Sequence, residues 1–355
     1  MINYFRDWYE RNFSDPQVIT LSLFLLGGFA FVIFAGQLFA PLLASIVIAY
    51  LLEGAVAFLE KYKLPRIIAL TLTFVIFMAL AVLLMFVFIP VLSEQFTQFF
   101  KELPKMIGQG QVLLMQLPEK FPSLVNQSQV EEITTYIRGE LISFGQVLIT
   151  KPLTSVVGLI TIIVYLILVP LLVFFLLKDK ELILKWIEGF LPGERDLTNE
   201  VWFEVNQKIA SYVRGKFVEI LIVFATTLIT FEFFNLNYAM LLAVLVGLSV
   251  IIPYVGAAVV TIPIMFVAYA QWGISDEFVY VLIAYAVIQF LDGNFLVPLL
   301  FSEVVSLHPV AIIAAVLFFG GLWGIWGVFF AIPLATLINA VINAWPSRET
   351  PQESP

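Results

Sequence analysis

The polar side chains best suited to bind a solute or exchange protons gather in Gln289–Pro309, which reads QFLDGNFLVPLLFSEVVSLHP. They lie among large apolar residues, and from Phe217 to Ser347 the chain has no Lys or Arg. Ionisable groups held in lipid without a basic partner are costly and are usually retained for a function. We therefore predict a transport site here. The candidate binding residues in this stretch are Gln289, Asp292, Asn294, Pro298, Glu303 and His308.

The composition places this stretch in a membrane protein. Hydrophobic residues make up 61% of the 355 residues and charged residues 12%, whereas a soluble domain has roughly 45–50% and about 25%. The mean hydropathy is +1.01. Apolar runs of about 20 residues without strand-type alternation predict an all-α polytopic membrane protein with six or more transmembrane helices. The lipid bilayer is then an obligatory partner.

The residue inventory argues against several other classes of protein. The chain has no Cys, which excludes disulfides and thiolate chemistry. Its single His leaves no second imidazole for a zinc site, and no Walker sequence for nucleotide hydrolysis is present. We expect no metal, no cofactor, no nucleic-acid partner and no enzymatic activity.

Changes in composition along the chain divide it into five regions. Residues 1–90 are expected to hold an N-terminal amphipathic helix and spans one to three, and residues 91–152 an extracytoplasmic helical loop region. Span four and cytoplasmic amphipathic helices follow in 153–216. The transport core occupies 217–346, and residues 347–355 form a disordered tail.

The basic residues predict the orientation of the chain. With the N-terminus inside, thirteen of the 18 Lys and Arg fall on the cytoplasmic side and five in the long external loop, as the positive-inside rule requires. Both termini are then cytoplasmic. In this interpretation Arg214 and Lys216 fix the topology, and Glu219 lies at the membrane interface.

Glu53 lies about two turns inside the second span and has two interpretations. It is either a proton or ion ligand, or a carboxylate that reaches toward the nearby Lys61 and Lys63. The second interpretation is favoured.

Two segments of the C-terminal part have the form helix, Gly/Pro-rich tip, helix. The first arm, Tyr238–Ile252, makes only about 22 Å of helix against roughly 30 Å of hydrocarbon, and Ala257–Gln271 returns from the tip. The second pair is His308–Phe319 and Val328–Ala344. We favour two re-entrant hairpins that enter from opposite faces, from which alternating-access sites are built; the alternative is two complete crossings each. The tip residues are Pro253, Tyr254 and Gly256 in the first hairpin and Gly320, Gly321, Gly324 and Gly327 in the second.

Broken helices expose free N–H groups that can hold a polar group without Lys or Arg. A phosphorylated solute would normally meet such basic residues, so a neutral hydroxyl-rich molecule or a small cation fits better. For Asp292 the alternative is a solvated turn at the membrane surface. For Glu303 and His308 it is a loop near water, with His308 at the start of a helix.

Several motifs together resemble the autoinducer-2 exporter (AI-2E) family, and within it the PerM-type permeases. The resemblance covers nearly the whole chain. The motifs are YVRGK at 212–216, IPYVG at 252–256, LDGN at 291–294 with Pro298, LHP at 307–309, FGGLWG at 319–324 and AIPLA at 331–335.

The resemblance implies a bacterial inner-membrane permease that forms a homo-oligomer, a pentamer, with an elevator-like moving unit built from the hairpins. Some members of the family export autoinducer-2, and others are linked to sodium/proton antiport. We therefore expect a secondary transporter that exports a small polar metabolite, such as an autoinducer-2-like signal, by alternating access. The alternatives are a sodium/proton antiporter that uses Asp292 and Glu303, and a membrane scaffold without transport.

Overall fold

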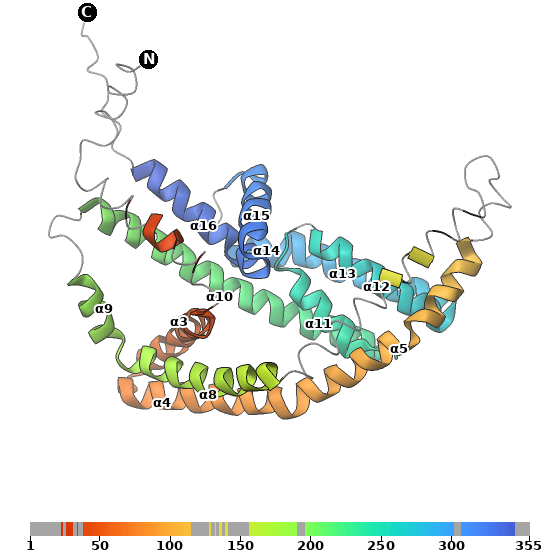
Figure 1. Cartoon of the computed structure of the whole chain (residues 1–355), viewed down its shortest axis with the longest axis horizontal. Helices are drawn as coiled ribbons and strands as arrows, with labels where there is room; N and C mark the ends of the chain where they lie inside the picture. Colours follow the sequence, from red (N-terminus) through yellow and green to blue (C-terminus); the bar gives the residue numbers. More distant parts are fainter. Residues whose placement is uncertain are drawn as a thin grey trace, which may run out of the picture. The chain divides into compact units, whose positions relative to one another are not determined.

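The computed structural model of the chain describes residues 38–114, 156–189, 196–253, 255–301 and 307–344. It also describes isolated positions at 23, 26–30, 34, 128, 132, 135, 136, 139 and 140. Within these ranges the regular elements are helices and no strand occurs (Figure 1). The predicted N-terminal amphipathic helix, the predicted tail at 347–355, Tyr254 and Glu303 lie outside the described residues.

The helices are named by chain order and by the labels of Figure 1. They are α3 (Ala40–Lys61), α4 (Arg66–Leu83), η1 (Leu84–Phe88), α5 (Ile89–Leu114), α8 (Val156–Lys178), α9 (Lys180–Glu188), α10 (Asp196–Phe233), α11 (Ala239–Ser249), α12 (Val255–Trp272), α13 (Asp276–Leu291), η2 (Asp292–Leu296), α14 (Val297–Phe301), α15 (Pro309–Trp323) and α16 (Ile325–Ala344).

In the described part of the chain, five helical segments are long and apolar enough to cross a membrane. Shorter apolar helices accompany them, including α11 and α15. The prediction of an all-α polytopic membrane protein is therefore confirmed. The five segments are Ala40–Lys61, Arg66–Gln111, Val255–Trp272, Asp276–Phe301 and Trp326–Asn343.

Two helices run through boundaries that we predicted from composition. The boundary at 90/91 falls inside the continuous segment Arg66–Gln111, and the boundary at 216/217 falls inside α10. With a rise of 1.5 Å per residue, the 46 residues of Arg66–Gln111 extend for about 69 Å, well beyond the roughly 30 Å of hydrocarbon. The change from apolar to polar composition thus occurs within a helix and does not require a loop.

Each of the two π-helical turns among the described residues is followed closely by a proline. Turn η1 ends two residues before Pro90, and η2 ends two residues before Pro298. A proline ring collides with the carbonyl of the residue four positions earlier and cannot donate to it. These carbonyls belong to Phe86 and Asn294, each in the middle of a π turn, where the wider turn makes room. This explains why Pro298 widens the helix at the candidate site without ending it.

The chain divides into two compact units. The first contains Met1–Phe74, Leu168–Gly215 and Leu300–Pro355, and the second contains Val75–Ile167 and Lys216–Leu299. Hairpin α11–α12 belongs to the second unit and hairpin α15–α16 to the first.

In the second unit, hairpin α11–α12 packs against α5 and α13 around an apolar core. Its base is fixed by two glutamines. Gln271 donates from Nε2 to the carbonyl of Asn235 and accepts from the amide of Asn237, both at 2.8 Å. Gln95 accepts from the amide of Leu241 at 2.9 Å, which satisfies a free N–H at the start of α11. The base of this hairpin is therefore held by specific polar contacts.

In the first unit, α15 and α16 pack side by side as the second hairpin (Figure 1). The turn is narrower than the predicted tip. Gly320 and Gly321 lie within α15 and Gly327 lies within α16. Gly324 makes the turn with φ +60°, a backbone conformation that favours glycine.

The two hairpins share one contact that only glycine permits. A Cβ added to Gly256, in the first turn of α12, would overlap the carbonyl of Ser249 at the end of α11. A Cβ added to Gly327 would overlap the carbonyl of Phe319 in the same way. In each hairpin the return helix thus begins with a glycine that touches the backbone of the outgoing helix. This likeness supports the prediction that the two hairpins are equivalent elements.

Candidate functional site

Gln289 and Asp292 lie three residues apart at the junction of α13 and η2, and so on the same face of the helix. The Asp292 Oδ1 and Gln289 Nε2 atoms are buried and have no hydrogen-bond partner among the described residues. A buried polar atom without a partner costs free energy, and such atoms are rare in folded proteins. The two residues therefore remain the best candidates from the predicted stretch.

The other predicted residues of this stretch lie differently. Asn294 is exposed, and its Nδ2 donates to the carbonyl of Phe290 at 2.9 Å, within its own helix. Pro298 is exposed on α14. His308 is the N-cap of α15, where its Nδ1 accepts from the amide of Val310 at 3.3 Å. The prediction that His308 marks the start of a helix is confirmed.

The centre of the site is an ion pair that the sequence analysis did not assign to it. Lys216 and Glu219 lie three residues apart on α10, with Lys216 Nζ 2.6 Å from Glu219 Oε2. Their side chains are only 6% and 2% exposed. The Lys216 ammonium also donates to the carbonyl of Val250 at 3.0 Å, at the C-cap of α11. The pair thus joins α10 to the tip of the first hairpin.

Asp292 completes this cluster. It interacts electrostatically with both Lys216 and Glu219. With all three groups ionised, two carboxylates face one ammonium, so the cluster has a formal charge of −1. It can take up one proton or one small cation without acquiring a net positive charge.

From the sequence, Lys216 was expected to fix the topology and Glu219 to lie at the membrane interface. The structure adds that both side chains are buried and that Lys216 is a basic partner for the site. This pairing was missed because Lys216 comes one residue before the Lys-free stretch that begins at Phe217. Their spacing was an available signal, since residues at i and i+3 share a helix face.

The tip of the first hairpin lies beside the ion pair. Pro253 accepts from the amide of Val255 at 2.7 Å, and the amide of Gly256 donates to Ile252 at 3.0 Å. On the return side, the Tyr285 hydroxyl on α13 donates to the carbonyl of Ala257 at 2.9 Å. Because α11 ends at the tip, the negative end of its dipole points toward the Lys216 ammonium.

Glu53 has partners other than the predicted Lys61 and Lys63. Its carboxylate pairs with Lys180 at 2.9 Å and with Arg66 at 3.2 Å, while Arg66 also reaches the carbonyl of Leu177 at 3.3 Å. These contacts connect α3, α4, α8 and α9 within the first unit. They favour a structural role for the carboxylate over ion binding.

We predict that Glu53→Gln lowers the free energy of unfolding by about 1 kcal/mol, because two partly exposed ion pairs are lost. Proton movement by the reconstituted protein should stay at the wild-type level. Glu60→Gln is the matched control, since Glu60 contacts Arg66 only at 3.5 Å, and its effect on thermal stability should be smaller. Loss of proton movement in Glu53→Gln would restore the ion-ligand interpretation.

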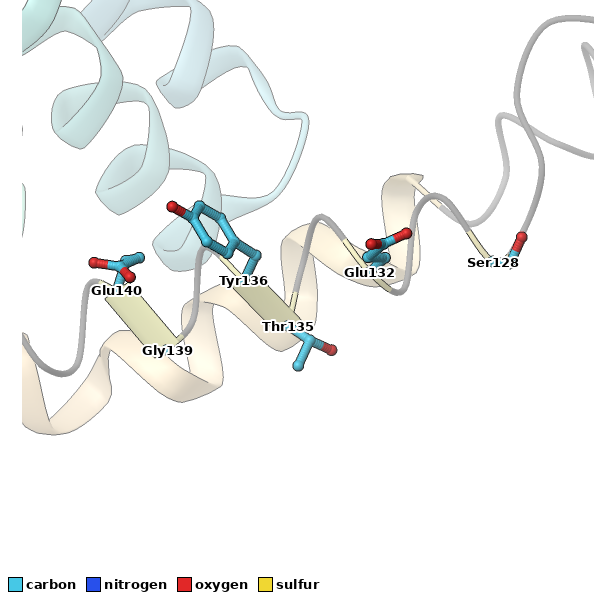
Figure 2. A pocket seen from close by; sticks show the side chains of 6 residues that line it. All are labelled: Ser128, Glu132, Thr135, Tyr136, Gly139 and Glu140. Carbon is cyan, nitrogen blue, oxygen red and sulfur yellow. The ribbon is translucent and has the colours of Figure 1, made fainter.

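An open pocket lies in the 91–152 region. Figure 2 shows its lining, in which Tyr136 and Thr135 point to opposite sides of the chain. Its described lining contains two carboxylates and three hydroxyl groups but no basic side chain. The lining residues are Ser128, Glu132, Thr135, Tyr136, Gly139 and Glu140.

The fold and site together define a helical, multi-pass membrane protein with a buried charged cluster at the tip of a helical hairpin. The sequence model of the family described as AI-2E family transporters matches residues 19–347. The chain belongs to this family of membrane transporters, as its motifs predicted.

Its relatives cover the chain almost completely. It is 46% identical over 353 residues to a protein of Escherichia coli strain K12 that bears the name of a permease, PerM, with 99% of this chain and 100% of the relative covered. It is 29% identical over 317 residues to YueF of Bacillus subtilis strain 168, named as a transport protein, with 87% and 85% covered.

Proposed function

We propose that the chain is a secondary transporter that moves a small polar solute out of the cell and takes up a proton at the Glu219–Asp292 carboxylates. The observation that carries this proposal is the cluster of the buried Lys216 and Glu219 with the half-buried Asp292 at the tip of a broken hairpin. Charged groups are retained inside membrane proteins chiefly along substrate or proton pathways.

The hairpin geometry supports alternating access as the mechanism. Helix α11 has 11 residues, which make about 16 Å of helix against roughly 30 Å of hydrocarbon. A helix of this length would end inside the membrane. The tip of the hairpin would then lie at the charged cluster. The equivalent glycine contacts at Gly256 and Gly327 favour two related hairpins, as in transporters built from inverted repeats.

The charge of the cluster restricts the solute. Two carboxylates and one ammonium repel a multiply charged anion, and a phosphorylated solute would need more basic groups. A neutral, hydroxyl-rich molecule or a small cation is compatible with a formal charge of −1. We propose the bacterial inner membrane as the location, with both termini cytoplasmic, in keeping with the distribution of Lys and Arg.

Proton movement in proteoliposomes tests the proposal. Purified protein is reconstituted with a pH-sensitive dye inside the vesicles, a pH gradient is imposed, and sodium chloride, glycerol and pentoses are added in turn. Wild-type protein should collapse the gradient with at least one probe. Asp292→Asn and Glu219→Gln should reduce the rate of gradient collapse to that of empty liposomes, because each removes a proton-accepting carboxylate.

Glu232→Gln is the control, because Glu232 is an exposed carboxylate on the same helix as Glu219. It should leave proton movement unchanged. A response to sodium alone would favour the antiporter, to which the unpartnered Asp292 oxygen is equally suited. Background flux with every probe would support a non-transporting scaffold, and full activity in both carboxylate variants would exclude the cluster as the coupling site.

A further inference from the structure

We propose that Lys216 is a positioning residue that ties the tip of hairpin α11–α12 to helix α10 and shares its ammonium between the tip and the site carboxylates. The inference deepens the proposed function by giving that site a connection to the hairpin. It rests on a juxtaposition within the second unit: a buried ammonium 3.0 Å from a tip carbonyl and 2.6 Å from a carboxylate.

The hydrogen bond from Lys216 to the Val250 carbonyl, which we call the tie, lies where the packing of α11 on α10 ends. Gly247 contacts α10 so closely that an added Cβ would lie 2.9 Å from Phe224 Cβ and 3.2 Å from the carbonyl of Ile220. Three residues later, Val250 ends the helix and the chain turns into the tip. Helix packing therefore fixes the arm up to this point, and the Lys216 hydrogen bond fixes the first residue beyond it.

The backbone carbonyl of Val250 is not capped by a backbone amide in the way that is usual at a helix end. Helices commonly end at a glycine that lets backbone amides cap the last carbonyls, but Ile251, Ile252 and Pro253 follow here. The amides of Ile251 and Ile252 bond instead to Leu248 and Ser249. The Val250 carbonyl receives the Lys216 ammonium, and a hydrogen bond from a charged donor is roughly twice as strong as a neutral one.

The Lys216 ammonium interacts electrostatically with two carboxylates. Glu219 acts on it from its own helix, and Asp292 acts on it from the end of α13. A cation held between a tip carbonyl and ionisable groups links the charge of the site to the position of the tip. Lys216 does not need to contact the solute for this role.

The test uses a single cysteine as a reporter, because the chain has no native Cys. Val250→Cys keeps the acceptor carbonyl and places a thiol on a residue that is only 9% exposed. The rate of labelling by a membrane-impermeant maleimide then reports how often the tip leaves its place. Labelling does not measure transport, so its outcome is independent of whether the proposed function fails.

We expect Lys216→Met to speed labelling about tenfold or more, because loss of a hydrogen bond to a charged group shifts an equilibrium by roughly that factor. The double variant Lys216→Met/Glu219→Met should be labelled equally fast, because it also lacks the hydrogen bond to Val250, although it leaves no Glu219 carboxylate without its partner. Lys216→Arg should restore slow labelling in part. Arg214→Met, which removes an exposed cation two residues away, should match wild type.

A second reporter separates release of the tip from general unfolding. Leu322→Cys places a thiol on α15 in the other hairpin, and Lys216→Met should leave its labelling rate unchanged. Slow, wild-type labelling at position 250 in the double variant would overturn the proposal, since Lys216 would then serve only as the partner of Glu219. Equal acceleration at both reporters would overturn it as well.

Discussion

Gly256→Ala should prevent the first hairpin from forming. The methyl group would occupy the position of the Ser249 carbonyl, which is backbone and cannot rotate away as a side chain can. Relief requires the start of α12 to separate from the end of α11. Because overpacking typically costs about 1–3 kcal/mol even where side chains can adjust, we expect a loss of at least about 3 kcal/mol in stability.

The measurement is the yield of monodisperse protein after detergent extraction, with the thermal unfolding midpoint of whatever is recovered. Gly327→Ala should have the same effect in the second hairpin, where the added methyl group meets the Phe319 carbonyl. Gly321→Ala is the matched control, since no described residue lies within 4 Å of an added Cβ there, and it should be neutral or slightly stabilising. Normal yield and midpoint for Gly256→Ala would show that the close approach is not required.

Lys216→Met should destabilise the protein more than the double variant Lys216→Met/Glu219→Met. The single change leaves the Glu219 carboxylate buried without its partner, and breaking a buried pair in this way costs about 3–5 kcal/mol. Replacing both partners by apolar side chains of similar size is often close to neutral. The double variant should therefore recover most of the lost stability, although it cannot exchange protons at Glu219.

Thermal unfolding in detergent at neutral pH measures this cycle, with Glu219→Met as the fourth member. Arg214→Met provides the control for loss of a positive charge near the same place, and it should change the midpoint little. If the single and double variants unfold at the same temperature, the 2.6 Å contact between Lys216 and Glu219 does not contribute to stability.

Much of the candidate site could be anticipated from residues close together in the chain. The start of α15 was predicted from His308 and Pro309, which act within one helical turn. The π turn at 292–296 was not predicted, although its cause, Pro298, is also close in the chain. Asp292 and Gln289 could be selected because a polar pair inside an apolar segment is visible without knowledge of the fold.

The contact of Lys216 with the hairpin tip and the partners of Glu53 could not be assigned in this way. Lys216 belongs by sequence to a polar segment, and only the folded chain brings the Val250 carbonyl, 34 residues later, to its ammonium. Glu53 has Lys61 and Lys63 nearby in sequence, yet it pairs with Lys180, 127 residues away. In both cases the contact depends on which segments pack together in the folded chain.

The sequence by itself determined the class of this protein, its helical composition and its family, because hydropathy, helix length and local motifs act over short stretches of chain. The tertiary structure alone decided that Glu53 pairs with Lys180 and that the Lys216 ammonium reaches the Val250 carbonyl. Such contacts depend on the distance between segments that are remote in sequence, and for Val250 that distance is set by the close packing of Gly247 against α10.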